Sequence, residues 1–372
     1  MKFDSVIFVL PNLHIGGAER NVLNLVSNWH KFSNLKIYLI LFERVENEYE
    51  FPKGVDIIIL NSRSSFAIYI DLFKKIRELN PLCVFSNLGA NHKLAILRLF
   101  LWNIKLFSRI GNDVPKYLLD VKKNRGYLRY FFERLLIFIS LLLSNKIIVQ
   151  SDAMKAGLIN QYHFSSFVFK SRIIQINNIL SSFDDIKLIK KSISPETMNF
   201  IVLSSLKKQK NIDFLLNAFK YINQEFENAN LSIFGNGPEF NYLQKIIETK
   251  KLDKFIYLKG FTKSNTAFAG ANFYINSSLY EGVSNGILEA MMIGIPIFTS
   301  NTSGSLVLDE ASIDGFYSMK IDSPENFAQK VIQIIKNYGF KFHNREIFLE
   351  KFSAKLVIND YINLIPIKKK RK

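Results

Sequence analysis

The 372-residue sequence contains one cysteine, two tryptophans and nine prolines. A single cysteine cannot form an internal disulfide, which excludes a small fold held together by disulfide bonds. Cys83 lies in the apolar run at 82–85 and is expected to be a small core residue. A reducing compartment such as the cytoplasm fits this cysteine usage.

Long apolar runs are also absent. The most hydrophobic segment is 127–146, and its charge-free part, 135–145, is well short of the ~20 residues that a transmembrane helix needs. At the start of the chain Asp4 interrupts a short apolar run and no small-residue cleavage site follows, so we expect no signal peptide. These patterns predict a cytoplasmic protein without a transmembrane helix.

Cofactor signatures are missing as well. The first predicted strand is not followed by G-x-G-x-x-G, so a dinucleotide cofactor is not implied. The histidines do not have the spacing of metal ligands; they are His14, His30, His92, His163 and His343. We therefore expect no metal site and no bound cofactor.

Acidic residues are scarce relative to basic ones: 32 Asp and Glu stand against 49 Lys and Arg, a net charge of +17. Residues 93–172 carry 14 Lys and Arg but 4 Asp and Glu, and they interleave these charges with apolar runs. This pattern favours a surface that rests on anionic lipid, because each basic residue near a membrane contributes about 1 kcal/mol. The alternative is a core helix with a solvated basic face. Nucleic acid is not expected, since no binding motif accompanies the charge.

What is present is a repeated alternation of short apolar runs and helix-like segments. Strands are expected at 5–10, 36–42, 55–60, 82–86, 105–110, 146–150 and 172–177, and helices at 18–29, 66–79, 91–102, 126–143 and 152–162. After a polar stretch the alternation restarts, with strands at 199–205, 231–235, 254–260, 272–278 and 296–300 and helices at 211–226, 239–249, 264–268, 285–293 and beyond 323. Strands alternating with helices predict parallel α/β sheets.

The fold class is therefore α/β, with two Rossmann-like domains whose parallel sheets face each other across a cleft. We expect an N-terminal domain at 1–180, a linker at 181–197 and a C-terminal domain at 198–350. The remaining 351–372 would form a helix, which can pack back on the N-terminal domain, and a basic tail. In such sheets ligands bind at the carboxyl ends of the strands.

The strand-to-helix loops carry the candidate site residues. Gly16 and Gly17 follow the first strand and open a helix, which suits an anion as well as it suits a tight turn. Lys207, Lys208 and Lys210 follow a later strand, where a lysine can reach phosphates or can simply be an exposed cluster. Gly235 opens the glycine-rich loop Gly235-Asn236-Gly237.

The stretch SSLYEGVSNGILEAMMIGIPIFTS at 277–300 raises the sharpest question, because Glu281 and Glu289 flank the mouth of an apolar helix. Ser284 or Asn285 can cap that helix, whose first N–H groups favour a diphosphate. Carboxylates accept hydrogen bonds from sugar hydroxyls, so the two glutamates can bracket one extended ligand. For Glu289 the alternative is ordinary complementation of the helix dipole.

These loops, in this order, resemble glycosyltransferase family 4, the retaining, nucleotide-sugar-dependent enzymes of the GT-B fold. The matching pieces are GGAERNVLNL, NKIIVQS, KKQKNIDFLLNAF, LSIFGNGPE, FIYLKGF and SSLYEGVSNGILEAMMIGIPIFTSN, which together span Gly16 to Asn301. The E-x₇-E spacing followed by Ala290, Gly294 and Pro296 is the most specific piece. The pattern is similar to enzymes that build O-antigen, capsule or other lipid-linked glycans.

The resemblance implies that 1–180 is the acceptor- and membrane-facing domain and that 198–350 is the nucleotide-sugar-binding domain. It also implies roles at matching positions. The catalytic residues would be Glu281, which would contact the donor sugar at the reaction centre, and Lys210, which would hold the diphosphate. Glu289 would bind the ribose, and Phe261 would lie near the base. The phosphate site would be completed by backbone at Gly16 and Gly17 and by the run Val283, Ser284, Asn285, Gly286 and Ile287. Further donor-binding candidates are Ser205, Gly235 and Gly282. Metal is usually not required in this family, because lysine and helix dipoles neutralise the leaving diphosphate.

Three departures from the family pattern stand out. Where the family usually has Gly-Arg-Leu, this chain has Ser204-Ser205-Leu206, so Ser205 replaces a charged diphosphate contact worth about 1.5–3 kcal/mol. Lys207 and Lys208 are not in register to replace it. Many members carry a histidine facing the sugar, but here the segment 107–115 offers Arg109, Asn112 and Asp113 as acceptor-side candidates. The segment 302–310 matches a Gly-Gly…Glu pattern only loosely.

The resemblance implies a transferase that moves a hexose or N-acetylhexosamine from a nucleotide diphosphate sugar, expected to be UDP-linked, to a polyprenyl-linked glycan. Such an enzyme would work on the inner face of the cytoplasmic membrane, in O-antigen or capsule synthesis. Two alternatives remain. One is a catalytically inactive partner protein that binds nucleotide, which Ser205 favours, and the other is a GT-B enzyme of another reaction, such as a sugar epimerase or a phosphorylase.

Overall fold

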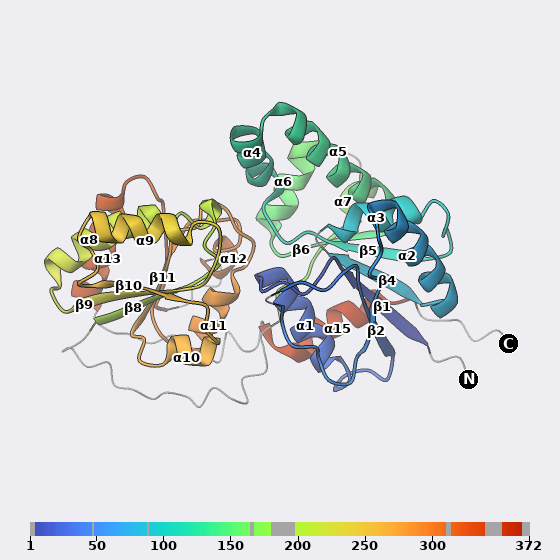
Figure 1. The fold of residues 1–372 in the computed structure, drawn as a ribbon, viewed down its shortest axis with the longest axis horizontal. Helices are drawn as coiled ribbons and strands as arrows, with labels where there is room; N and C mark the ends of the chain where they lie inside the picture. The colour runs from blue at the N-terminus through green and yellow to red at the C-terminus, as the bar shows by residue number, and fades with distance from the viewer. Residues whose placement is uncertain are drawn as a thin grey trace. The chain divides into compact units, whose positions relative to one another are not determined.

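The computed structural model describes residues 4–46, 48–87, 89–163, 167–179, 198–309, 314–338 and 352–366. The chain divides into two compact units (Figure 1). Unit 1 comprises residues 1–182 and 352–372, and unit 2 comprises residues 183–351. The expected linker at 181–197 lies outside the described residues.

Unit 1 is built on a parallel sheet of seven strands in the order β3-β2-β1-β4-β5-β6-β7. The strands are β1 (Ser5–Leu10), β2 (Lys36–Leu41), β3 (Asp56–Ile59), β4 (Cys83–Asn87), β5 (Lys105–Arg109), β6 (Lys146–Val149) and β7 (Ile173–Gln175). The helices are α1 (Gly17–Trp29), α2 (Ser65–Leu79), α3 (Ala90–Leu97), α4 (Val114–Arg125), α5 (Tyr127–Leu143), α6 (Asp152–Tyr162), α7 (Phe167–Lys170) and α15 (Ala354–Asn363).

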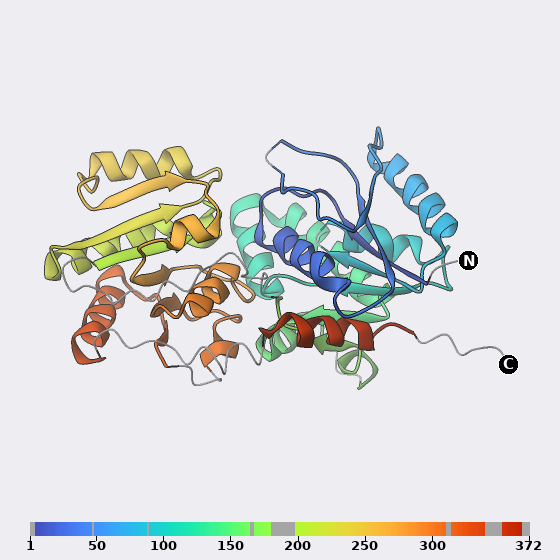
Figure 2. The same ribbon diagram turned by 90° about the horizontal axis from the view of Figure 1, so that it is seen from below.

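Helices cover both faces of the unit 1 sheet. This covering explains why the sequence of β1 is almost entirely apolar. All six residues of β1 are buried. Phe8 packs in a cluster with α1 and α15, whereas Ile7 and Val9 pack on the opposite face against α2 and α3. Because successive side chains of a strand point to opposite faces, a strand buried on both sides needs apolar residues at every position. Figure 2 shows α15, in red, lying along the same face as α1.

Unit 2 repeats this plan with six parallel strands in the order β10-β9-β8-β11-β12-β13. The strands are β8 (Met198–Leu203), β9 (Ala229–Phe234), β10 (Ile256–Gly260), β11 (Phe273–Asn276), β12 (Ile297–Ser300) and β13 (Phe316–Met319). The helices are η1 (Lys208–Lys210, a 3-10 turn), α8 (Ile212–Glu225), α9 (Phe240–Thr249), α10 (Ser264–Phe268), α11 (Asn285–Ile293), α12 (Leu306–Asp309) and α13 (Pro324–Tyr338). One large apolar cluster joins β8 and β9 to α8 and α13.

Both strand orders contain a switch point, where neighbouring strands send the chain off in opposite directions. In unit 1 it lies between β1 and β4, and in unit 2 between β8 and β11. Open α/β sheets bind ligands outside the carboxyl ends of the strands at such points. The strand order therefore places the candidate ligand site of each unit at the carboxyl ends of the strands beside its switch point.

The sequence did not predict α4, β13 or the short elements α7, η1 and α12, and it predicted a longer α3. The segment 114–125 is the helix α4, because Asp113 caps it and Pro115 suits its first turn. The segment 316–319 is the edge strand β13, paired with β12. Helix α3 ends at Leu97 and does not reach Trp102, whose side chain is exposed. The other expected strands and helices of the described residues are confirmed, with ends shifted by a few residues.

Candidate active site

At the switch point of unit 2 the loops after β8 and β11 are bonded to each other. The Ser277 hydroxyl donates to the carbonyl oxygens of Lys210 (3.1 Å) and Asn211 (3.0 Å). The Gln209 side chain donates to the carbonyl oxygen of Tyr280 at 2.7 Å, and the Leu279 N–H donates back to that of Gln209 at 2.9 Å. These bonds fix η1, and with it Lys210, beside the loop that carries Glu281.

Lys210 and Glu281, both predicted to be catalytic, form an ion pair with each other. Their side chains are only 12% and 14% exposed, so water screens the pair weakly. The Ser278 hydroxyl donates to the second carboxylate oxygen of Glu281 at 2.9 Å, and the Asn276 amide lies 3.5 Å from it. The arrangement places one cation suited to phosphate beside one carboxylate suited to sugar hydroxyls.

Helix α11 begins directly after this pair. Ser284, one of the two expected caps, occupies its N-cap position, but its hydroxyl makes no capping hydrogen bond. Instead Ser284 interacts with the buried hydroxyl of Tyr274. The backbone can approach Tyr274 because residue 286 is glycine: a Cβ there would lie 2.4 Å from Tyr274 Oη. The first turn of α11 thus packs closely against Tyr274, and the Ser284 side chain does not cap it.

Tyr274 connects the two glutamates. Its side chain is fully buried, and Glu289, one turn into α11, is 3% exposed. Burial raises the pKa of Tyr274 well above its usual 10, and the charges of Glu281 and Glu289 raise it further. Both carboxylates therefore act on the same phenol, which keeps its proton at neutral pH and can donate a hydrogen bond.

The other predicted donor-site residues of unit 2 lie at the same sheet edge or pack below it. The Gly235 N–H donates to the Gly260 carbonyl at 2.8 Å, which places the loop after β9 beside the loop after β10. Phe261, at that position, is 48% exposed and can offer its ring face to a base. Ser205 is half-buried, whereas Lys207 and Lys208 are exposed. Among the remaining candidates Asn285 is half-buried, and the following are buried: Gly282, Val283 and Ile287.

In unit 1, Gly16 and Gly17 stand at the start of α1 as predicted, with Gly16 as the N-cap residue. A carboxylate is already close by, since a Cβ on Gly16 would lie 2.5 Å from Glu19 Oε2. The Tyr49 hydroxyl donates to the Gly16 carbonyl at 3.3 Å. An anionic ligand at this helix end would therefore meet Glu19, which would have to move aside.

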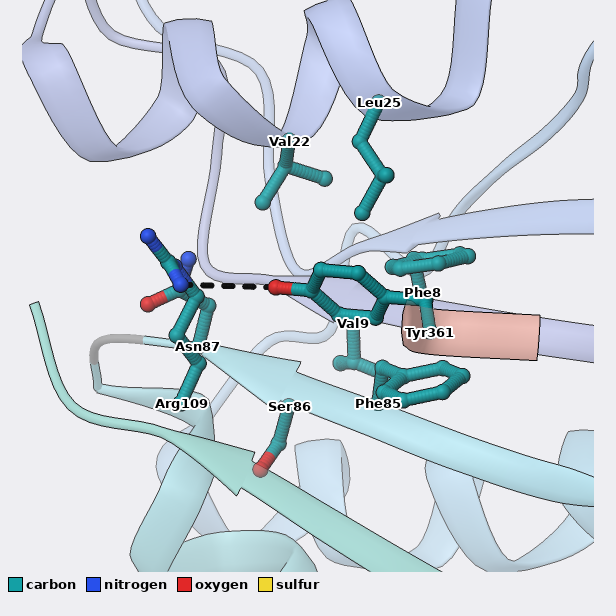
Figure 3. Close-up of a pocket in the computed structure, with 9 residues that line it drawn as sticks. All are labelled: Phe8, Val9, Val22, Leu25, Phe85, Ser86, Asn87, Arg109 and Tyr361. Atoms are coloured by element: carbon teal, nitrogen blue, oxygen red, sulfur yellow. Dashed lines mark hydrogen bonds between the residues drawn. The ribbon is translucent and has the colours of Figure 1, made fainter. Parts of the chain in front are cut away.

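The three acceptor-side candidates have different environments. Asn112 is exposed, and Asp113 is committed to capping α4, where its carboxylate accepts from the Lys116 N–H at 3.1 Å. Arg109, at the end of β5, is 4% exposed and lines a cavity of about 10 Å³ at the strand ends. Figure 3 shows its hydrogen bond to the hydroxyl of Tyr361, which comes from α15.

Sequence reasoning missed three side chains that shape the unit 2 site: Tyr274, Asn276 and Ser278. The polar run Asn276-Ser277-Ser278 directly after an apolar strand was the available signal, because polar residues at a carboxyl strand end commonly face a ligand. For Tyr274 the sequence carried no signal, since it reads as an ordinary strand residue. Its role depends on the tertiary contact with Gly286.

The described residues contain neither a candidate metal cluster nor a membrane-spanning helix. Among these residues no group of three or more His, Cys, Asp or Glu side chains lies close enough to hold a metal ion. None of the helices described is long and apolar enough to cross a membrane.

The two parallel-sheet units define the GT-B class of fold. HepE of Anabaena, in a structure with UDP and glucose, superposes with a TM-score of 0.76 at 15% identity over 97% of this chain and 98% of HepE. At this identity the likeness concerns the fold alone. The expected GT-B architecture is thereby confirmed.

The sequence comparisons agree with this class. Residues 197–337 match the family model described as group 1 glycosyl transferases. An uncharacterized glycosyltransferase of Methanocaldococcus jannaschii is 29% identical over 299 residues, which cover 73% of this chain and 72% of the relative. A poly(ribitol-phosphate) alpha-N-acetylglucosaminyltransferase of Staphylococcus aureus is 23% identical over 59% of this chain, but the match spans only 43% of that relative. Together these findings support a glycosyltransferase enzyme of the hexosyltransferase kind.

Proposed function

We propose that the chain transfers a hexose or N-acetylhexosamine from a nucleotide diphosphate sugar to a lipid-linked glycan acceptor with retention of configuration. The donor is expected to be a UDP-sugar, and the pathway is the synthesis of a surface polysaccharide of the O-antigen or capsule kind, as in family 4. The observation that carries the proposal is the Lys210–Glu281 pair at the uncapped mouth of α11.

Each group of this site has a role in the proposed reaction. Lys210 gives up part of its contact with Glu281 and binds the diphosphate, whose negative charge grows as the sugar departs. The first turn of α11 adds its dipole. Glu281 is then released to bind a hydroxyl of the donor sugar, and buried Glu289 binds the ribose. No side chain needs to act as a nucleophile if the leaving phosphate itself helps to deprotonate the acceptor.

The relatives support the choice of donor. HepE is described with UDP and glucose, and the staphylococcal relative is named for N-acetylglucosamine transfer to a phosphate-rich polymer. One of these proteins is thus described with UDP and the other is named for a hexosamine, which is why UDP is the first donor nucleotide to be tested. Metal is not expected to be needed, because Lys210 and the helix supply the positive charge.

The first experiment is thermal unfolding of the full chain with UDP, GDP, ADP and CMP. A nucleotide at 100 times its dissociation constant stabilises the native state by about 2.7 kcal/mol. UDP should raise the unfolding temperature, and Lys210→Ala and Glu289→Gln should abolish the rise. Lys245→Ala, an exposed lysine of α9, is the matched control and should leave it unchanged. Equal responses in all variants would contradict the proposed donor site.

One observation favours a second candidate, a catalytically inactive protein that binds nucleotide. Ser205 takes the place where the family usually has an arginine, and Lys207 and Lys208 are exposed. Nucleotide-dependent stabilisation without transfer to any acceptor, unchanged by Ser205→Arg, would favour this reading. Transfer that Ser205→Arg accelerates would favour the enzyme.

The acceptor-side surface is proposed to rest on an anionic membrane. Large apolar side chains at least 44% exposed gather on and beside α5, which packs against α3 and α4; they are Leu99, Phe100, Trp102, Leu119, Tyr127, Leu128, Phe131, Phe132, Leu135 and Leu142. Along α5 the spacing of 128, 131, 132 and 135 places them on one face. Lys122, over the ring of Tyr127 at 4.6 Å, and Arg125 lie next to this face. Exposed apolar area bordered by cations fits a lipid surface better than open water.

Vesicle sedimentation tests this surface. Leu128→Ser with Phe131→Ser should weaken binding to vesicles containing phosphatidylglycerol, and Lys122→Gln with Arg125→Gln should do so chiefly at low salt. Leu356→Ser, which alters a residue 47% exposed on α15, is the control. Full binding by both pairs of variants would remove the membrane from the proposal but leave the transferase intact.

A further inference from the structure

The carboxyl edge of the unit 1 sheet contains a buried arginine whose surroundings differ from those of the other charged site residues. Arg109 is the last residue of β5, between the ends of β4 and β6. Only 4% of its surface is exposed. Its guanidinium lines the cavity shared by Asn87 at the end of β4 and Val22 of α1, next to the switch point (Figure 3). Topology therefore places it where open sheets bind ligands.

The partners of Arg109 are neutral. Its Nη1 donates to Tyr361 Oη at 3.3 Å, and its Nη2 donates to the side-chain oxygen of Asn178. Among the residues that the structure describes, no carboxylate forms an ion pair with it. Asp113, nearby in sequence, is turned to the N–H groups of α4. By contrast Lys210 of unit 2 faces Glu281.

A guanidinium stays protonated in proteins, so its charge is present whatever the surroundings. Burying a cation without a counter-ion is unfavourable, because neutral oxygens replace only part of the lost hydration. An arriving anion would compensate this charge. The planar fork of arginine also matches the oxygens of a phosphate or carboxylate, which two neutral acceptors do not exploit.

We infer that Arg109 is the binding residue for an anionic group, a phosphate or a carboxylate, of the glycosyl acceptor. This inference rests on the proposed function and names the chemical class of its acceptor. The cavity of about 10 Å³ has room for one water molecule but not for a phosphate. The anion must therefore replace Asn178 or Tyr361 as hydrogen-bond acceptor at the rim of the cavity.

The competing interpretation is an arginine that only ties β5 to α15. In that case Arg109→Gln, which can still donate to Tyr361 and Asn178, would preserve the function. Arg109→Lys keeps the charge but loses the fork. The two variants therefore separate charge from structure, and both are compared with Arg98→Gln. Arg98 is the matched control because its guanidinium donates to a backbone carbonyl, that of Leu143, at 2.6 Å.

A binding measurement tests the site without catalysis. The full chain carrying Lys210→Ala, which removes the cation of the donor site, is titrated with inorganic phosphate during thermal unfolding. Phosphate should raise the unfolding temperature, the rise should vanish when Arg109→Gln is added, and it should persist with Arg98→Gln or Arg109→Lys. No rise in the Lys210→Ala chain, or an equal rise with Arg109→Gln, would overturn the inference.

A transfer assay then decides whether the anion at Arg109 belongs to the acceptor or to the nucleotide. The acceptors are undecyl diphosphate N-acetylglucosamine and the undecyl glycoside of the same sugar, with UDP-[14C]glucose as donor. The wild type should prefer the diphosphate acceptor at least tenfold in kcat/KM, and Arg109→Gln should lose the preference with an unchanged KM for the donor. A raised KM for the donor would assign the anion to the nucleotide and overturn the acceptor assignment. Transfer to neither acceptor would count against the proposed function, while the phosphate titration still decides the role of Arg109.

Discussion

The contact between Gly286 and Tyr274 gives a stability prediction that can be worked out from the geometry. A Cβ at position 286 would lie 2.4 Å from Tyr274 Oη, 2.9 Å from the Leu203 carbonyl oxygen and 3.0 Å from Tyr274 Cζ. Real Cβ contacts are never so short, so Gly286→Ala forces α11 or Tyr274 to move. Overpacking of this kind costs about 1–3 kcal/mol. In a unit of this size that lowers the unfolding temperature by about 2–12 °C.

The second mutation identifies the cause. Tyr274→Phe removes the oxygen at 2.4 Å but leaves the Leu203 carbonyl at 2.9 Å, so it should restore part of the loss. Alone it removes a long hydrogen bond to the Leu203 carbonyl, 3.5 Å, and should cost about 0.5–1 kcal/mol. Urea unfolding of the four chains gives the coupling energy, expected at about 0.5–2 kcal/mol in favour of the double mutant. Additive losses, or a neutral Gly286→Ala, would refute the packing described for the mouth of α11.

Three further predictions follow from the same contacts. Because the folded chain holds the proton of Tyr274 above pH 10 while the unfolded chain releases it, stability should fall as pH rises past about 10, and Tyr274→Phe should reduce that fall in pH-dependent urea unfolding. Cys83 is 0% exposed and burial raises the pKa of its thiol, so a thiol reagent at pH 8 should label it only at the rate of unfolding; fast labelling of the native chain would contradict this burial. Lys210→Met and Glu281→Gln should each cost about 1.5–3 kcal/mol, and the double mutant should cost less than their sum in a thermal-unfolding cycle, because each single change leaves one buried charge unpaired.

Much of the fold followed from the sequence because its central strands are buried on both faces. The run at 6–10 is apolar throughout because it fills two cores, and the strand expected at 5–10 is β1 to the residue. The helix at 285–293 was equally clear, since Gly294 supplies the left-handed residue that ends it. Strong local requirements of this kind survive in a single sequence.

The elements that were missed lack such requirements. Helix α4 has charged and polar residues around most of its surface, so the helical periodicity of its apolar residues is weak. Only Asp113 and Pro115 indicated that a helix begins there. Strand β13 pairs at the sheet edge, where the partner β12 decides the outcome. In the site, Glu281 and Lys210 were named from their loops, but their pairing joins residues 71 apart in the chain and depends on the tertiary fold.

The same limit explains why Arg109, Asn112 and Asp113 could not be ranked from sequence. All three are polar and lie within five residues at the carboxyl end of one strand. Their difference arises only when α4 claims Asp113 as its cap and α15 and Asn178 enclose Arg109. Among the described residues, the cation at the unit 2 edge, Lys210, thus has a carboxylate partner, whereas the cation at the unit 1 edge, Arg109, has only neutral ones. A ligand phosphate must compete with Glu281 for Lys210, whereas an anion reaching Arg109 displaces only neutral oxygens. Reversing the charge of Lys210 should therefore lower both the stability of the chain and its affinity for the ligand. Removing the charge of Arg109 should lower the affinity alone.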